Sequence, residues 1–192
     1  MARVAHTPRN MATTAAIIIK HYNYYLNVHR YFTMENQIKE QFHAAFYDVI
    51  RDSIENSDFE HVVRLYKEIQ DRLAKMLKKN GPSYNKLHED FDVPFFEQRL
   101  RQNAFDGASM ASLVHTTFAW IHNLQMPIRD SSAREAKQRV LEVSGSMADI
   151  VPVYIKEVHG CIDTMEKDMK EFYENRDHPV VKEMLRQAMT KK

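Results

Sequence analysis

The side chains that could do chemistry are few, and their spacing completes no catalytic site. Glu40 and His43 stand at the Glu-x-x-His spacing of one half of a di-iron site. A helical di-iron site needs a second such pair and two further glutamates on facing helices, and the sequence contains one pair. We therefore interpret Glu40 and His43 as polar residues on a helix surface, and we expect no bound metal.

The remaining reactive side chains are isolated from one another. His115 and His122 stand two turns apart beside the apolar face of one predicted helix, with no carboxylate at metal-ligand spacing beside them. Cys161 is the single cysteine, which excludes an intramolecular disulfide and a cysteine metal cluster. Because the four glycines are scattered, no loop of clustered glycines is present to cradle a phosphate. We expect a protein that is not an enzyme and that carries no cofactor.

Two charged features could instead bind a partner. The first is the basic face of a predicted helix, formed by Arg64, Lys67, Arg72, Lys75, Lys78 and Lys79. Such a basic amphipathic pattern is typical of helices that bind calmodulin or lie on a membrane surface. It is also compatible with an ordinary core helix whose basic side faces water, and this second interpretation is the one that we favour.

The second feature is a short corner between two predicted helices, Met126–Asp130. The planar guanidinium of Arg129 could bind an acidic partner or a phosphate. Alternatively, Arg129 could hold carbonyls or a carboxylate near the helix end, while Asp130 caps the following helix. We favour the second alternative, and both residues remain candidates for partner binding.

The corner joins two well-defined helical patterns. Apolar residues recur at three- and four-residue steps before it, at Met110, Leu113, Val114, Thr117, Phe118, Ile121 and Leu124. Asp106 can cap the start of this central helix, and Pro127 should end it because proline has no amide hydrogen to donate. Asp130, Ser131 or Ser132 should cap the next helix, because Ser132 and Glu135 stand at capping-box spacing.

Helical spacing recurs along most of the chain. We expect helices over residues 11–32, 34–55, 58–79, 83–90, 131–142, about 147–175 and 179–190. A further helix should begin at Asp92 and precede the central helix. A capping box from Ser57 to Glu60 should start the helix 58–79, and Pro152 should lie in the first turn of its helix or kink it. No segment alternates with a two-residue period. The predicted fold is all-α, an antiparallel multi-helix bundle of about seven to nine helices without a sheet.

The apolar stripes of the outer helices are expected to face the core. They include Ile38, Phe42 and Val49 in the segment 34–55, Leu141 in the helix 131–142, Phe172 in the long helix, and Val180, Met184, Leu185 and Ala188 in the last helix.

Length and charge suggest one domain with an arm. The 192 residues fit a single helical domain, 35–192, preceded by a segment 1–34 that holds four basic and no acidic residues and is rich in tyrosine. We interpret this segment as a basic aromatic docking arm, with a targeting segment as the alternative. The net charge of +1 gives no indication of a nucleic-acid partner. No apolar run approaches the roughly 20 residues of a membrane span. The single cysteine and the lack of an Asn-x-Ser/Thr acceptor favour a reducing, intracellular setting, so we expect a cytoplasmic protein.

Several segments resemble the T-complex protein 11 family. Residues 41–54 resemble its aromatic helix, and residues 58–77 resemble its aliphatic helix. The closest motif is Met126-Pro127-Ile128-Arg129-Asp130, which resembles the family's Pro-Val-Arg-Asp signature at the end of the central helix. Two shorter motifs add to it: Asn103–Asp106 before that helix, and Met165–Met169, which resembles a late helix with methionines and an aspartate. The resemblance covers about residues 38–189.

The resemblance implies a non-enzymatic, all-helical protein linked to cyclic-AMP-dependent kinase signalling. We therefore predict an adaptor or scaffold whose partners are kinase-pathway or calmodulin-like proteins. The alternative is a structural component of a larger assembly, such as a cilium, a flagellum or a virus particle, that docks through residues 1–34.

Overall fold

A computed structural model describes residues 37–38 and 40–190, of which 184–185 and 188–190 are described by their backbone alone. The regular structure in this range is helical, without a strand, which confirms the predicted all-α class for the described residues. The helix expected over 11–32 and the arm 1–34 lie outside them. The chain divides into two compact units, Met1–Tyr47 and Asp48–Lys192. All contacts reported below lie within the second unit.

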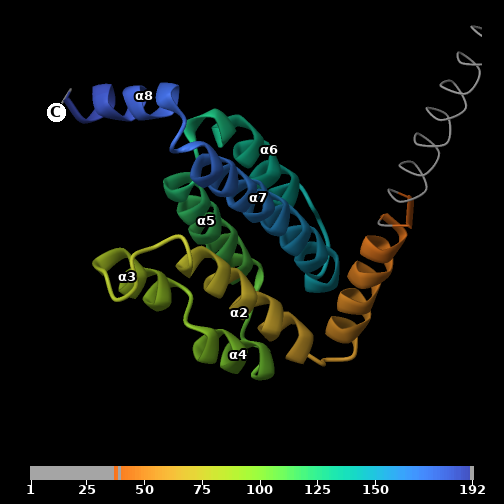
Figure 1. Cartoon of the computed structure of the whole chain (residues 1–192). Helices are drawn as coiled ribbons and strands as arrows, with labels where there is room; N and C mark the ends of the chain where they lie inside the picture. The colour runs from red at the N-terminus through yellow and green to blue at the C-terminus, as the bar shows by residue number, and fades with distance from the viewer. Residues whose placement is uncertain (1–36, 39, 191–192) are drawn as a thin grey trace, which may run out of the picture. The chain divides into compact units, whose positions relative to one another are not determined.

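A helix over residues 40–55 runs from the first unit into the second. The elements that follow are α2 (Glu60–Ala74), α3 (Pro82–Asp90), α4 (Val93–Arg101), α5 (Gly107–Leu124), the 3₁₀ turn η1 (Pro127–Arg129), α6 (Asp130–Leu141), α7 (Met147–Asn175) and α8 (Pro179–Thr190) (Figure 1). None of the helices in the described part of the chain is long and apolar enough to cross a membrane.

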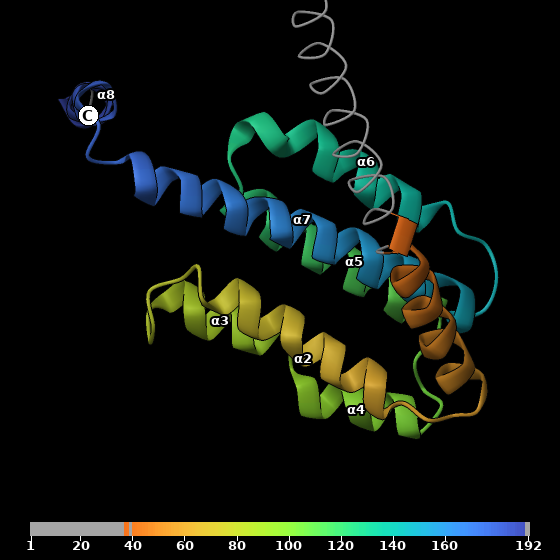
Figure 2. The same ribbon diagram turned by 45° about the vertical axis from the view of Figure 1, so that its right-hand side comes forward.

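Helices α5, α6 and α7 pack on one another, and α2 packs on α7 (Figures 1 and 2). Helices α3 and α4 contact α2. The largest side chains that are fully buried come from several of these elements and from the loop after α3: Ile69, Leu73, Leu87, Phe91, Ile121, Ile155 and Ile162. Burying an aliphatic side chain of this size stabilises the fold by about 1.5–3 kcal/mol.

Three hydrogen bonds between side chains, or from a side chain to the backbone, join elements at this core. The hydroxyls of Thr117 on α5 and Tyr154 on α7 lie 2.9 Å apart. Gln70 Nε2 donates to the carbonyl oxygen of Phe91 at 2.6 Å. Trp120 Nε1 on α5 donates to Asp90 Oδ2 on α3 at 3.0 Å. These bonds fix which helices are neighbours, because a buried polar group without a partner is costly.

Helix α2 is shorter than predicted at both ends. Its N-cap residue is Phe59, which makes no side-chain cap, and Asp58 Oδ1 accepts from the Glu60 amide at 3.2 Å, so the expected capping box from Ser57 to Glu60 is wrong. Ser57 has φ 58° and belongs to the turn before the helix. The helix ends at Ala74 because the next amides bond three residues back, from Met76 to Leu73 and from Leu77 to Ala74. Such 3₁₀-type bonds tighten and close the last turn.

The corner after α5 also differs in detail from the prediction. Asp106 does cap α5, accepting from Ser109 N at 2.8 Å. The helix ends at Leu124, however, and Pro127 begins η1 instead of ending α5. No side chain caps α6, so the predicted cap is wrong. The reason is that η1 leads directly into α6: the carbonyl of Pro127 already accepts the Asp130 amide.

Helix α7 begins where predicted, after the break at Ser144–Ser146. Ser146 N donates to Asp149 Oδ2 at 2.9 Å. Gly145 has φ 138°, and a Cβ there would lie 2.5 Å from the same Asp149 oxygen, so both conformation and space favour glycine. Pro152 is buried in the second turn of α7, not in the first.

Some apolar residues predicted to face the core are exposed. These are Ile38, Phe42, Val49, Leu141, Phe172 and Val180. Phe172 and Val180 belong to a continuous stretch, residues 171–180, in which every residue is exposed. Helix α8 has its predicted bounds, and the side chains of Met184, Leu185 and Ala188 are outside the described set.

Candidate functional site

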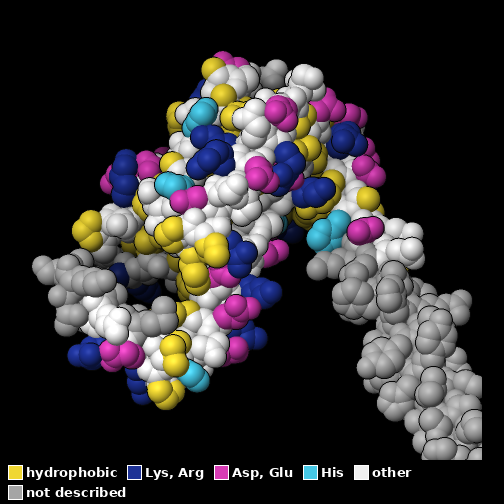
Figure 3. All heavy atoms as spheres, turned by 90° about the horizontal axis from the view of Figure 1, so that it is seen from above, with side chains coloured by type: hydrophobic (Ala, Val, Ile, Leu, Met, Phe, Trp, Pro, Cys, Tyr) yellow, Lys and Arg dark blue, Asp and Glu magenta, His cyan; other side chains and the backbone are white. Residues whose placement is uncertain are grey.

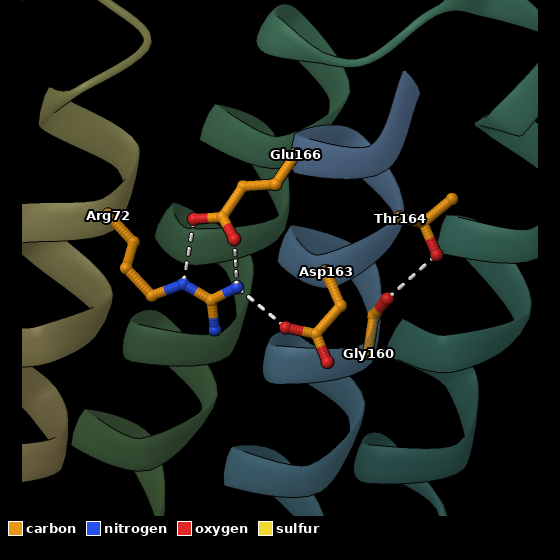
Figure 4. Close-up of polar contacts among 5 residues, drawn as sticks. All are labelled: Arg72, Gly160, Asp163, Thr164 and Glu166. Carbon is orange, nitrogen blue, oxygen red and sulfur yellow. Dashed lines mark hydrogen bonds and ion pairs between the residues drawn. The ribbon is translucent and has the colours of Figure 1, made fainter. Parts of the chain in front are cut away.

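Arginines from three elements converge on the carboxylates of α7. Arg72 of α2 donates through Nε and Nη2 to the two oxygens of Glu166, at 3.0 and 2.7 Å. Its Nη2 also donates to Asp163 Oδ1 at 2.6 Å (Figure 4). The Arg72 side chain is only 14 % exposed. A bidentate guanidinium–carboxylate pair fixes geometry better than a single charge contact, so this contact positions α2 on α7.

The second arginine comes from the corner. Arg129 donates through Nε to Asp168 Oδ2 at 2.9 Å and through Nη2 to Oδ1 at 2.7 Å. The Asp168 side chain is 8 % exposed, whereas that of Arg129 is 41 % exposed. Arg129 therefore holds a carboxylate near the helix end, as the favoured interpretation of the corner predicted.

Asp130 does not have the capping role predicted with it. Its Oδ1 accepts from Gln125 Nε2 at 2.9 Å and lies 3.3 Å from His122 Nδ1. The carboxylate thus bridges the end of α5 to the start of α6. Its place in the first turn of α6 is favourable, because the amino end of a helix carries partial positive charge.

A third pair joins α6 to α7. Arg139 Nη2 donates to Glu157 Oε2 at 2.7 Å, and the Glu157 side chain is 14 % exposed. With Arg72 and Arg129, this pair completes a network in which three arginines bind four carboxylates of one helix. Figure 3, a view of the molecule from above, shows acidic and basic side chains interspersed over the surface in view.

The network keeps its members ionised. The hydrogen bond from Arg129 lowers the pKa of Asp168 below its ordinary value. The hydrogen bond to Glu166 raises the pKa of Arg72. His159, one turn before Asp163, has a lowered pKa because burial disfavours its charged form, and its Nε2 is buried without a hydrogen-bond partner. A neutral imidazole therefore lies beside charges that are already paired.

The network offers no reactive group. Cys161 faces the gap between α6 and α7, where burial raises the pKa of its thiol to about 11, so the thiol stays protonated near neutral pH. Among the described residues, no group of three His, Cys, Asp or Glu side chains could hold a metal ion. Glu40, His43, His115 and His122 are all exposed. The arrangement binds helices together.

The predicted basic face divides into two parts. Its first three members are paired within the chain: Arg64 lies 3.6 Å from Glu60, Lys67 lies 2.9 Å from Asp71, and Arg72 binds α7. The other three, Lys75, Lys78 and Lys79, are exposed in the turns that follow α2. Within the described part of the chain, no carboxylate lies within ion-pair distance of these three lysines.

Sequence reasoning did not identify the carboxylates that complete the network. These are Glu157, Asp163, Glu166 and Asp168. One signal was available for Asp168: it stands three residues after Met165 on the apolar stripe of α7, and a carboxylate on a buried face needs a cationic partner. No comparable signal marks Asp163 and Glu166, which lie at the edge of that stripe.

Comparison with known proteins relates the chain to a family. No solved structure matches the chain. The family model described as T-complex protein 11 matches residues 21–173, beginning before and ending earlier than the resemblance read from the sequence. The match contains both the corner of Arg129 and the α7 segment of Asp168. Because the matched segment covers most of the chain, the protein belongs to the T-complex protein 11 family.

Proposed function

We propose that the protein is a non-enzymatic helical adaptor, an antiparallel bundle that binds protein partners in cyclic-AMP-dependent kinase signalling in the cytoplasm. Family membership supports the signalling context. The observation that carries the adaptor role is the unequal use of positive charge: Arg72, Arg129 and Arg139 are paired inside the chain, whereas Lys75, Lys78 and Lys79 are exposed and have no such pair among the described residues.

We call Lys75, Lys78 and Lys79 the lysine turn. Three like charges within five residues create a local positive potential that reaches about 8–10 Å before salt screens it. The carbonyl end of α2 offsets part of this charge, because the carboxyl end of a helix is partially negative. The remainder is available to an acidic partner, whose approach it would accelerate.

Charge reversal tests the lysine turn. The variant K75E/K78E/K79E is compared with K156E/K167E/K170E, which makes the same change in net charge at exposed positions of α7. The probes are the purified regulatory and catalytic subunits of the cyclic-AMP-dependent kinase, and calcium-loaded calmodulin. We expect one probe to bind the native chain and to bind the lysine-turn variant at least about tenfold more weakly, a loss of about 1.4 kcal/mol.

The control variant should bind like the native chain. If none of the probes binds the native chain, or if both variants lose binding equally, the proposal is wrong. Binding to the native chain should also weaken as salt is raised, because exposed charges are screened.

A further inference from the structure

The two sides of α6 differ in how their positive charges are used. On the side toward α7, Arg129 before the helix and Arg139 on it are each paired with a carboxylate. On the side toward α5, Arg134 and Lys137 line a groove between the two helices. In the part of the chain that the structure describes, no carboxylate lies within ion-pair distance of either residue. Among the described residues, the positive charges on one side of α6 are therefore paired with carboxylates, and those on the other side are not.

The groove has an apolar floor. Phe118 of α5 and Ala133 of α6 lie at its base and are almost completely buried, and Ala119 lies beside them at the surface. The volume of the groove is about 250 Å³. Small-molecule sites usually enclose roughly 300–1,000 Å³. A space of this size suits one or two side chains of a partner better than a cofactor.

The one carboxylate in the groove does not neutralise it. Asp130 is held at the amino end of α6 by Gln125 and lies beside His122, so its charge is engaged locally. Arg134 and Lys137 stand one and two turns further along α6. The groove therefore has a net positive end next to an apolar floor, which is complementary to a carboxylate with an apolar neighbour.

We propose that the groove between α5 and α6 is a docking site for an acidic segment of a protein partner. A glutamate or aspartate of that segment pairs with Arg134 and Lys137, and an adjacent apolar side chain lies on Phe118 and Ala133. The planar fork of Arg134 can bind a carboxylate through two parallel hydrogen bonds. This site is separate from the lysine turn and does not depend on it.

A designed peptide tests the groove in the full chain. The probe is a fluorescein-labelled octapeptide, Glu-Glu-Leu-Glu-Glu-Phe-Glu-Glu, and its counterpart has lysine in place of every glutamate. Binding is followed by fluorescence anisotropy. The variant R134E/K137E reverses the rim charges, and A119W fills the groove from an exposed position without changing charge. The control K156E/K167E makes the same charge change on α7, and circular dichroism confirms that each variant is folded.

We expect the acidic peptide, and not the basic one, to bind the native chain, the control and the lysine-turn variant equally. Its Kd should rise at least about tenfold in R134E/K137E and in A119W. The proposal is overturned if the peptide fails to bind at roughly 1 mM, if A119W binds it normally, or if the control loses as much affinity as R134E/K137E.

The same experiment tests two other occupants of the groove, a small anion and a second copy of the chain. Displacement of the peptide by an equal concentration of inorganic phosphate would make the groove a small-anion site and reject the peptide. A native chain that dimerises through this groove, with R134E/K137E monomeric, would assign it to a second copy. Loss of kinase binding in the lysine-turn variant, with peptide binding intact, separates this inference from the proposed function.

Discussion

The corner at Arg129 and the lysine turn look similar in the sequence, but their positive charges have different surroundings in the structure. Both place positive charge next to a helix end. Arg129 binds Asp168 through two hydrogen bonds, whereas Lys75, Lys78 and Lys79 extend into solvent. The difference lies in what stands opposite: α7 offers the corner a carboxylate that is almost completely buried. A cationic motif is therefore interpretable only when its partner is known.

The largest expected effect concerns the α7 side of this comparison. Ile162 of α7 is fully buried. Ile162→Ala should reduce the free energy of unfolding by about 3 kcal/mol, because it removes buried methyl groups and leaves a cavity. Urea unfolding followed by circular dichroism measures this value. A loss below about 1 kcal/mol would show that α7 is not part of a closely packed core.

A smaller loss is expected at the ion pairs between α2 and α7. Arg72→Ala should reduce the free energy of unfolding by about 1 kcal/mol, since Asp163 and Glu166 are exposed enough to regain water. Arg72→Lys should recover only part of the loss, because an ammonium cannot bind both oxygens of Glu166 with a planar fork. If Arg72→Lys recovered the whole loss of stability, charge attraction alone would explain the contribution of Arg72.

The Arg129–Asp168 pair should make the stability of the protein depend on pH. The pKa of Asp168 is lowered from its ordinary value of 3.8 in the folded protein. The pair therefore stabilises the fold above about pH 3.8, and its contribution is lost as the pH falls through the folded pKa. The difference in unfolding free energy between the native chain and Asp168→Asn should be full at pH 7 and should shrink below pH 3.8. A difference that is independent of pH would contradict this pairing.

The smallest effect is expected in the lysine turn. Lys78→Ala should change the free energy of unfolding by less than about 0.5 kcal/mol, because its ammonium is hydrated in the folded and unfolded states alike. Thermal unfolding of this variant beside Arg129→Ala sharpens the comparison. A clear destabilisation by Lys78→Ala, as large as that by Arg129→Ala, would mean that the lysine turn and the Arg129 corner contribute equally to stability.

Much of the fold follows from local patterns. The helical class, the cap at Asp106, the break at Ser144–Ser146 and the bounds of α8 depend on periodicity, capping and chain breakers, which act over a few residues. Two of the failures share a cause. Helix α2 ends early and α6 lacks a side-chain cap because nearby backbone carbonyls accept the amides at these helix ends in bonds that reach three residues back, and the residue types do not specify such bonds.

The candidate site was harder to predict than the fold. The corner of Arg129 was identified from its charges and from the family signature, but its partner lies 39 residues further along the chain. Ion pairs of this range depend on how helices pack, and helical periodicity specifies which face is buried without specifying what faces it. Only Asp168, a carboxylate on an apolar stripe, carried a local signal.

The single tryptophan has a consequence of its own. Trp120 is partly buried and bonded to Asp90, so one indole spans the seam between α5 and α3. Its emission would shift to longer wavelength if the seam opened, even while the other helices stayed in place. The protein thus contains an intrinsic fluorophore that distinguishes local separation of α3 from unfolding of the whole chain.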